Sequence, residues 1–243
     1  INRYLLASGS EVRYVQNITD IDDPLLERAN RDGIDWAQLA DQQIELFRDD
    51  MVNLRVIPPT DYIGAVEAIP LVAAAIEQLS AKDSIYPVDE DLYFKVHKDA
   101  DFGTRSHLSL DEMLKIFSER GGDPARVGKK DPLDCLVWMA QRPNEPGWDS
   151  PFGIGRPGWH IECTAIAIKY LQPDSNEPSL IDIQGGGSDL IFPHHEMCAA
   201  QAQVLTGKPL ASTYVHAGMI GLDGEKMSKS KGNLVFVSKL LAA

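Results

Sequence analysis

The chain has little of several features that mark specialised protein classes. Its 243 residues include three cysteines, Cys135, Cys163 and Cys198, and this odd number at wide spacing excludes a disulfide framework and a C-x-x-C pair. No uninterrupted apolar run approaches the roughly 20 residues that span a bilayer, and no signal peptide opens the chain. We therefore expect reduced thiols in a cytoplasmic protein.

Basic side chains are also scarce. The formal net charge is −13, and clustered Lys and Arg are scarce apart from the short run at residues 226–231. A nucleic-acid binder usually carries a basic face, because neutralising phosphates supplies most of its affinity. A polynucleotide partner such as tRNA is therefore disfavoured. What the chain does have is an ordinary globular composition, with 44% hydrophobic and 24% charged residues.

The pattern of apolar residues predicts strands that alternate with helices at both ends of the chain. The predicted elements there are a helix end at 1–9, a strand at 11–18, a helix at 159–171, a strand at 180–184, a helix at 194–205 and a strand at 214–220. This alternation predicts an α/β fold with a parallel sheet. Residues 80–155 are less regular, with connections rich in glycine and proline, and are typical of an insertion.

Three glycines follow the predicted strand at 180–184. Gly185, Gly186 and Gly187 would let a ligand approach the backbone closely and would expose N–H groups to an anion. Open α/β sheets bind ligands at such strand ends. The carboxylate of Asp189 could accept hydrogen bonds from ribose hydroxyls. A tight turn explains the glycines equally well, so this run alone leaves both interpretations open.

Thiol and imidazole side chains flank the glycine run. Zinc accepts both as ligands in tetrahedral geometry. His194 and Cys198 share a helix face if their helix begins near residue 193, whereas Cys163 must come from another helix. Taken alone, each of these residues is better explained as a buried core thiol or a hydrogen-bonded histidine. We interpret Cys135 as a core residue as well. As a group, with His195 beside them, they favour a soft-metal site.

Lysines and hydroxyls follow a turn at residues 223–224. Lys226 and Lys229 could neutralise charge that develops on phosphoryl groups in a transition state. On spacing alone, a solvated basic loop explains this run better. A role for this run is therefore indicated only by its exact sequence, together with the other segments described next.

A resemblance to a known family rests on these segments together. The sequence K-M-S-K-S at 226–230 is identical to a signature of class I aminoacyl-tRNA synthetases. The segments GWHIEC at 158–163, GGGSDLIFPHHE at 185–196 and NITDIDD at 17–23 are similar to those of cysteinyl-tRNA synthetase. The resemblance covers essentially the whole chain. It implies an α/β, Rossmann-like class I synthetase catalytic domain with a parallel sheet and an inserted connective region.

Two families share these segments, and other residues separate them. The segments ERGGDP at 119–124 and YVHAGMIG at 214–221 are similar to signatures of the mycothiol cysteine ligases, which join cysteine to glucosaminyl-inositol on the same fold. The synthetase usually continues its double histidine as Glu-Asn-Glu, whereas this chain has Glu196-Met197-Cys198. The ligase family is therefore favoured. The alternatives are a cysteinyl-tRNA synthetase core and a non-catalytic, zinc-stabilised binding module.

The resemblance implies roles for individual residues. Cys163 and His194 would bind zinc, with Cys198 as an additional candidate ligand. The remaining site residues are Asn17, Ile18, Thr19 and Trp159 at the cysteine end of an adenylate, Gly187, Ser188 and Asp189 at its nucleotide, Ile220 at adenine, and Lys226 and Lys229 as the catalytic lysines at the phosphates. The implied cofactor is Zn²⁺, and the implied substrates are L-cysteine, ATP with Mg²⁺, and glucosaminyl-inositol, used by a monomer.

The resemblance also divides the chain. The predicted parts are a remnant of the first half of the catalytic domain at 1–57, a connective region at 58–157 and the second half with the lysine loop at 158–243. The family's H-x-G-H motif and first zinc-binding cysteine would precede residues 1–9, and neither occurs in the sequence. We therefore expect these 243 residues by themselves to bind zinc poorly and to form little adenylate.

Overall fold

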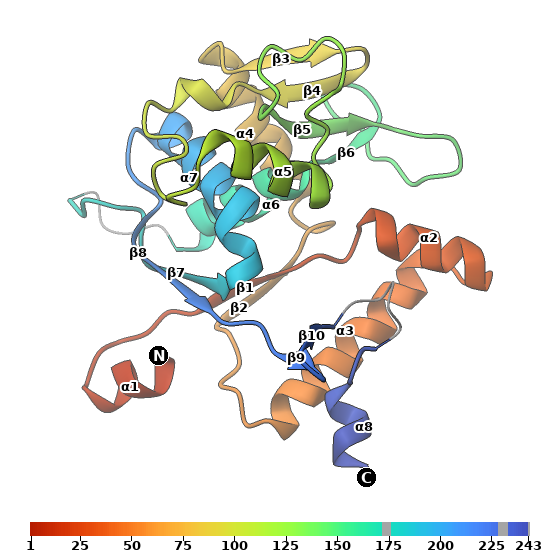
Figure 1. Ribbon diagram of the computed structural model, residues 1–243, viewed down its shortest axis with the longest axis vertical. Helices are drawn as coiled ribbons and strands as arrows, with labels where there is room; N and C mark the ends of the chain where they lie inside the picture. The colour runs from red at the N-terminus through yellow and green to blue at the C-terminus, as the bar shows by residue number, and fades with distance from the viewer. Residues whose placement is uncertain (172–175, 228–232, 243) are drawn as a thin grey trace. The chain divides into compact units, whose positions relative to one another are not determined.

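The computed structural model describes residues 1–171, 176–227 and 233–242, which fall into two compact units (Figure 1). The first unit consists of Ile1–Val66 and Gly218–Ala243, and the second of Glu67–Ala217. The elements of the first unit are α1 (Asn2–Ala7), β1 (Val15–Ile18), α2 (Asp23–Asp32), α3 (Trp36–Asn53), β2 (Asp61–Gly64), β9 (Gly221–Leu222), β10 (Glu225–Lys226) and α8 (Val237–Leu241).

The first unit contains a pair of parallel strands and two well-capped helices. β1 and β2 pair in parallel register. α2 begins after Asp22, whose carboxylate accepts a hydrogen bond from the backbone N–H of Leu25 at 2.7 Å. α3 begins after Asp35, whose carboxylate accepts one from Gln38 at 3.0 Å. Such caps satisfy N–H groups that the first helical turn leaves without partners.

The second unit combines a parallel strand pair with an antiparallel sheet. Its elements are α4 (Ile69–Ala81), β3 (Ile85–Val88), β4 (Asp91–Phe94), η1 (Val96–Lys98), α5 (Leu110–Glu119), β5 (Cys135–Ala140), β6 (Gly155–Pro157), α6 (Trp159–Tyr170), β7 (Ile181–Gly187), η2 (Ser188–Leu190), η3 (Ile191–His195), α7 (Glu196–Thr206) and β8 (Ala211–Ala217). β7 and β8 are parallel, and the antiparallel sheet has the order β3-β4-β5-β6.

The core of the second unit lies where its three long apolar helices meet. α4, α6 and α7 pack against one another, and each contributes side chains that are fully or almost fully buried, among them Val72, Ile76, Ile161, Ile166 and Met197. Within this unit the antiparallel sheet lies at one end, and β7 and β8 lie at the other (Figure 1). The helices therefore connect the region predicted as an insertion to the parallel strands.

The predicted elements around the glycine run are largely confirmed, with one correction. α6 matches its predicted range closely, and α7 ends at Gly207, which has the positive φ of 76° typical of a helix C-terminus. The predicted strand at 180–184 ends too early, however. β7 continues through the three glycines, and Gly185, Gly186 and Gly187 pair with β8 residues. The interpretation of these glycines as a turn is therefore wrong.

Several elements were not predicted from the sequence. The division of the chain into 1–57, 58–157 and 158–243 stays a prediction. α2, β2, β3 and β5 have no counterpart among the sequence-based expectations. β8 also begins three residues earlier than the predicted strand at 214–220, at Ala211. Both parallel pairs, β1–β2 and β7–β8, are of the kind expected for an α/β fold.

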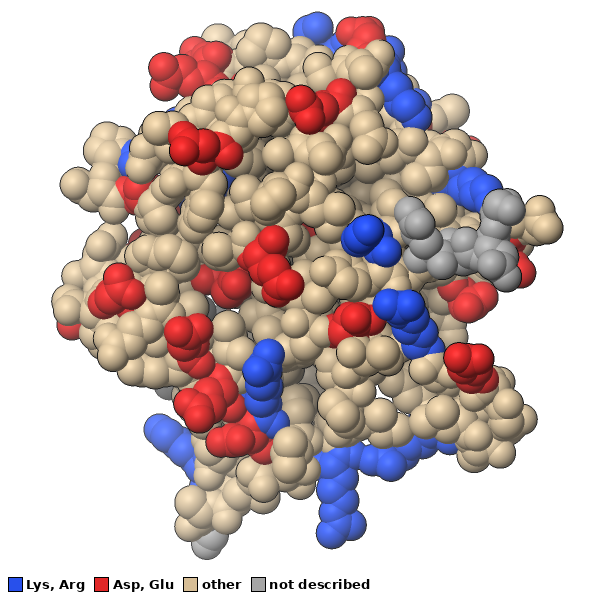
Figure 2. All heavy atoms as spheres, turned by 180° about the vertical axis from the view of Figure 1, so that it is seen from behind, with Lys and Arg blue, Asp and Glu red and all other residues tan. Residues whose placement is uncertain are grey.

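Two surface properties bear on the expected partners. Among the helices of the described residues, none combines the length and apolar character that crossing a bilayer requires. Figure 2 shows acidic and basic side chains interspersed over one face, rather than basic side chains gathered into a continuous patch there.

Candidate functional site

A cluster of aromatic and imidazole rings is formed by side chains of α6, η3 and β8. Trp159 and His160 begin α6, and the Trp159 ring stacks on that of His194 with centroids 4.5 Å apart. The Nδ1 atoms of His160 and His194 are 3.0 Å apart. A second imidazole pair follows, in which Nδ1 of His195 lies 2.7 Å from Nε2 of His216. Thus Trp159 and His194, which the sequence predicts as site residues, are in direct contact.

Burial holds these imidazoles in the neutral form. It lowers the pKa of His160 to about 3. It also lowers the pKa of His195 to about 4, with neighbouring His216 acting in the same direction. For His194, burial first, then His160 and His195, lower the pKa well below the usual range of histidine. A neutral imidazole keeps one lone pair free to accept a hydrogen bond or bind a metal ion.

A hydrogen-bond chain assigns the tautomer of His195. The side-chain nitrogen of Gln184, on β7, lies 3.3 Å from Nε2 of His195. Because an amide nitrogen only donates, Nε2 of His195 accepts, and its Nδ1 carries the proton and donates to Nε2 of His216. The chain links β7, the start of α7 and β8. It therefore fixes the ring of His195 in one orientation.

Two of the cysteines lie near these rings. Sγ of Cys198 is 3.8 Å from Nε2 of His194 and donates to the carbonyl of His160 at 3.3 Å. Burial raises the pKa of this thiol to about 12. Cys163, on α6, packs against the apolar cluster that includes Cys198, and burial first, then Cys198, raise the pKa of its thiol well above the usual range. Both thiols are therefore protonated at neutral pH.

The geometry fits part of a zinc site. Zinc binds nitrogen at about 2.0 Å and sulfur at about 2.3 Å, so tetrahedral geometry separates the two donors by about 3.5 Å. The 3.8 Å between His194 and Cys198 is close to that value. The described residues do not, however, bring three or more potential ligands together in a metal-binding group. Zinc is therefore not confirmed as a cofactor, and the ligand set of Cys163, His194 and Cys198 stays a prediction.

A buried carboxylate holds the start of α7. Glu196, which is 1% exposed, accepts hydrogen bonds from the backbone N–H groups of Gly103 at 2.9 Å and Ser106 at 2.8 Å. It also accepts one from Nη1 of Arg105 at 3.1 Å, and this guanidinium pairs with Asp99 at 2.8 Å. A carboxylate in a first helical turn also favours the positive end of the helix dipole. The carboxylate of Glu196 therefore anchors the start of α7, directly after His194 and His195.

This anchor leads to a stability prediction. Glu196→Ala removes the buried carboxylate that accepts hydrogen bonds from Arg105 and from the backbone N–H groups of Gly103 and Ser106. We expect the free energy of unfolding of the complete protein to fall by about 3 kcal/mol, measured by urea unfolding. Glu77→Ala, in an exposed position of α4, is the matched control and should change it by less than about 0.5 kcal/mol. Equal losses in the two variants would contradict this role of Glu196.

The predicted site residues divide between the two units. The second unit holds Trp159, Cys163, Gly187, Ser188, Asp189, His194 and Cys198, and the first holds Asn17, Ile18, Thr19, Ile220 and Lys226. Lys226 lies in β10, and Lys229 lies outside the residues that the structure describes. Within the second unit, the structure brings together Trp159, His194 and Cys198.

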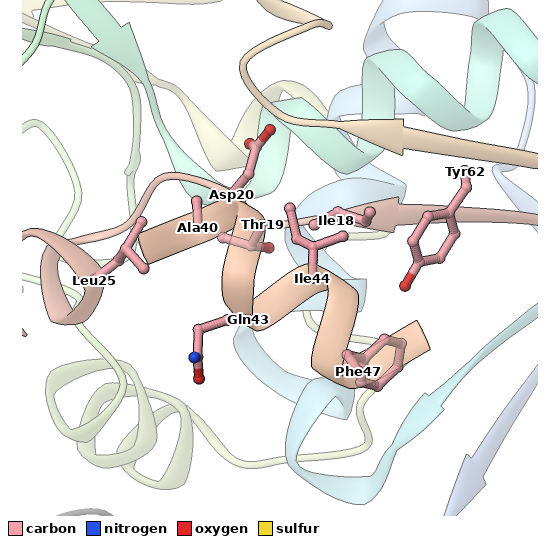
Figure 3. A pocket seen from close by; sticks show the side chains of 9 residues that line it. All are labelled: Ile18, Thr19, Asp20, Leu25, Ala40, Gln43, Ile44, Phe47 and Tyr62. Atoms are coloured by element: carbon pink, nitrogen blue, oxygen red, sulfur yellow. The ribbon is translucent and has the colours of Figure 1, made fainter. Parts of the chain in front are cut away.

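A cavity in the first unit contains two of the predicted residues. Ile18 and Thr19, at the end of β1, line a cavity of about 170 Å³ that opens against α3 (Figure 3). Its other lining residues are Asp20, Leu25, Ala40, Gln43, Ile44, Phe47 and Tyr62. Gln43 and Tyr62 also line this cavity, and neither was expected from the sequence. The cavity therefore presents a mixed lining of polar and apolar groups.

His160 and His216 also belong to the ring cluster, and Gln184 is hydrogen-bonded to it, although the sequence predicts no role for these residues. His160 and His216 stand inside the segments that carry the family resemblance, which was the available signal. Gln184 is the last residue before the glycines of β7, and no sequence motif marks it as a site residue. Only the packing of α6 and α7 and the register of β7 with β8 reveal these contacts.

Comparison with known proteins decides the family. The family model described as the tRNA synthetases class I (C) catalytic domain matches residues 1–243. The chain belongs to this family. The match confirms the expected class I synthetase domain, with its α/β, Rossmann-like architecture, and agrees with the parallel strand pairs of both units.

Two similar curated proteins carry the same name. An L-cysteine:1D-myo-inositol 2-amino-2-deoxy-alpha-D-glucopyranoside ligase of Thermomonospora curvata is 60% identical over 243 residues, which cover 100% of this chain and 57% of the relative. The protein of that name from Kribbella flavida is 60% identical over 240 residues, covering 98% and 58%. The chain therefore spans little more than half the length of these relatives.

Solved structures support the same fold. A complex of Mycobacterium tuberculosis methionyl-tRNA synthetase with methionyl-adenylate matches with a TM-score of 0.67 and 16% identity, over 99% of this chain and 56% of that one. Another structure of that synthetase with the adenylate gives a TM-score of 0.63, also at 16% identity and with the same coverage. At this identity the likeness establishes the fold alone.

Proposed function

We propose that the complete protein containing this chain activates L-cysteine with ATP and joins it to the amine of glucosaminyl-inositol. The observation that carries the proposal is the similarity of the whole chain, at 60% identity, to a relative named as a ligase of L-cysteine and that amino sugar. Membership in a class I synthetase family supports activation of the amino acid as an adenylate. A monomeric state and a cytoplasmic location stay predictions.

The proposed chemistry has two balanced steps. A carboxylate oxygen of cysteine attacks the α-phosphorus of ATP, and pyrophosphate leaves with Mg²⁺ to give cysteinyl adenylate. The amine of glucosaminyl-inositol then attacks the carbonyl carbon of the adenylate. AMP leaves, the amine gives up a proton, and an amide is formed. Lys226 and Lys229 are proposed to stabilise the negative charge that develops on the phosphates in the first step.

The other residue assignments belong to the same proposal. In the second unit, Trp159 would contact the cysteine end of the adenylate, and Gly187, Ser188 and Asp189 its nucleotide. The residues of the first unit with proposed roles are Asn17, Ile18 and Thr19 toward cysteine and Ile220 toward adenine. A zinc ion held by Cys163, His194 and Cys198 would offer a coordination position to the substrate thiolate, which a serine hydroxyl would fill poorly.

Cys198 provides the sharpest test of the zinc assignment. Because its Sγ lies 3.8 Å from Nε2 of His194, we expect Cys198→Ala to lower the zinc content of the complete protein at least tenfold in the presence of a weak chelator. Cys135→Ala is the matched control, since Cys135 is also buried but lies in β5 and contacts Gln201 instead. Elemental analysis measures the zinc content of both variants. Unchanged zinc in Cys198→Ala would remove Cys198 from the ligand set.

Acceptor specificity tests the function itself. The complete protein is given cysteine, ATP and either glucosaminyl-inositol or tRNA, and the products are separated. Formation of AMP and the cysteinyl amide of the amino sugar is the expected result. Charging of tRNA without amide formation would instead establish the alternative, a cysteinyl-tRNA synthetase. Failure to form any adenylate would contradict both activities.

A further inference from the structure

Arg120 joins the end of α5 to the segment that contains the proposed nucleotide-binding and zinc-binding residues. Nη1 of Arg120 donates to the backbone carbonyls of both Asp189 and Phe192. We call these two hydrogen bonds the Arg120 bridge. The segment at 119–124, to which Arg120 belongs, resembles a ligase signature, yet none of its residues has a role in the proposed chemistry. The bridge connects this unexplained segment directly to the site.

The chain turns sharply at Arg120, which directs the arginine away from its helix. Arg120 is the C-cap residue of α5. Gly121 has a φ of 82°, and the N–H of Gly122 donates to the carbonyl of Phe117 at 2.8 Å, which is the hydrogen bond of a Schellman motif. A Cβ atom at Gly122 would lie 2.4 Å from the ring of Phe117. The two glycines are therefore required for this helix end, and the helix end sets the position of Arg120.

The same segment is fixed on its other side to the antiparallel sheet. The carboxylate of Asp123 accepts a hydrogen bond from the hydroxyl of Tyr93, on β4, and another from Nζ of Lys129 at 2.9 Å. The side chain of Lys129 is only 2% exposed. The base of the Arg120 bridge is therefore rigid, because buried and charge-assisted contacts hold the residues that follow Arg120.

The two carbonyls that Arg120 binds lie at the two ends of the short connection between β7 and His194. Asp189 lies in η2, directly after β7, and Phe192 precedes Pro193 and His194. Phe192 has φ −141° and ψ 138°, so its backbone departs from the helical conformation of its neighbours and its carbonyl is directed out of the turn. By bonding to both carbonyls, Arg120 sets the spacing between Ser188–Asp189 on one side and His194 on the other.

We propose that Arg120 is a positioning residue that fixes the nucleotide-binding residues relative to the cysteine-binding residues. The proposal rests on the proposed function, in which Ser188 and Asp189 hold the nucleotide and His194 lies at the cysteine end. Adenylate formation requires the cysteine carboxylate and the α-phosphate to meet in a narrow range of distance and angle. Without the bridge, each ligand still binds to its own residues. The two reacting groups are then aligned only part of the time, so the rate falls more than the affinities do.

The test compares Arg120→Met with Arg120→Lys and a matched control in the complete protein. Lys82→Met is the control, because Nζ of Lys82 also donates to two backbone carbonyls, those of Val204 and Leu205, both at 2.7 Å, at the far end of α7. Cysteine-dependent ATP–pyrophosphate exchange is measured for each variant and divided by the concentration of active sites. Amide hydrogen exchange of residues 188–195 is measured in parallel by mass spectrometry.

We expect Arg120→Met to lower kcat about 10- to 100-fold, with the KM values for ATP and cysteine changing less than about threefold. Arg120→Lys should recover part of the rate, and Lys82→Met should keep it. Amide exchange at 188–195 should become faster in Arg120→Met and not in Lys82→Met. A kcat within threefold of the unsubstituted protein, or an equal loss in Lys82→Met, would overturn the proposal.

The two measurements separate this inference from the proposed function. An unsubstituted protein without cysteine-dependent exchange would refute cysteine activation, and the hydrogen-exchange comparison would still decide whether Arg120 orders the segment. Unchanged amide exchange in Arg120→Met would overturn the positioning role even if the protein activates cysteine. Activity in the unsubstituted protein with a selective loss in Arg120→Met would support both.

Discussion

His194→Ala is expected to lower cysteine-dependent ATP–pyrophosphate exchange by the complete protein about 100- to 1,000-fold, as removal of one well-placed polar group in other active sites does. The ring of His194 is 5% exposed, stacks on Trp159 and lies 3.0 Å from His160, so its loss removes the centre of the ring cluster. The 3.8 Å contact with Cys198 is lost as well. Bound zinc, measured by elemental analysis, should fall together with the activity.

The control for this prediction is another histidine with different surroundings. His97 has a side chain that is 68% exposed and pairs with Asp131 at 3.1 Å. His97→Ala should therefore retain activity within about twofold, since the contact that it removes is exposed and contributes little to stability. If His194→Ala kept more than a tenth of the activity, the place of His194 at the cysteine end would be wrong.

Gly186→Ala is expected to lower the free energy of unfolding by about 1–3 kcal/mol, the usual cost of overpacking. A Cβ atom at Gly186 would lie 2.8 Å from Cδ1 of Leu190 and 2.9 Å from Cε1 of His195. The ring of His195 cannot yield freely, because it is hydrogen-bonded to Gln184 and His216. Leu190 belongs to η2, which also contains Ser188 and Asp189, so we expect repacking around its side chain to raise the KM for ATP about tenfold.

The neighbouring glycine offers a matched control on the same strand. A Cβ atom at Gly185 would find its nearest neighbour, the carbonyl oxygen of Val215, at 4.0 Å. Gly185→Ala should therefore leave the KM for ATP unchanged and should not destabilise the protein, since alanine restricts the unfolded chain more than glycine does. Urea unfolding and initial-rate kinetics measure the two effects. If both variants had the same free energy of unfolding and the same KM for ATP, the close contacts predicted for a Cβ atom at Gly186 would have no effect.

Much of the fold was predictable where local signals and periodicity agree. α6 and α7 follow their apolar patterns, and Gly207 marks the end of α7 as expected. α2 was missed although its signals are present, because Asp22 caps it and Gly33 ends it with a φ of 65°. No helix is predicted directly after the strand at 11–18, so the cap at Asp22 and the glycine at position 33 were not used as signals. The error was therefore one of interpretation rather than a lack of information.

Other features depend on contacts that no local pattern contains. Glycine has little intrinsic preference for strands, so the extension of β7 through Gly187 depends on its pairing with β8. In the site, the i, i+4 spacing of His194 and Cys198 predicted their proximity, which the 3.8 Å contact confirms. The contact between His160 and His194 could not be predicted, because it requires the packing of α6 against α7.

The supports of the segment that bears His194 both come from the chain between β4 and β5. Glu196 is bonded to the loop around Arg105, and Arg120 reaches the carbonyls of Asp189 and Phe192 from the end of α5. Replacing this part of the chain would therefore change both supports at once. A chimera that exchanges the polypeptide between β4 and β5 for that of a distant homologue would import foreign partners for both anchors. Such a transplant should succeed only when the recipient segment at 187–196 is exchanged with it.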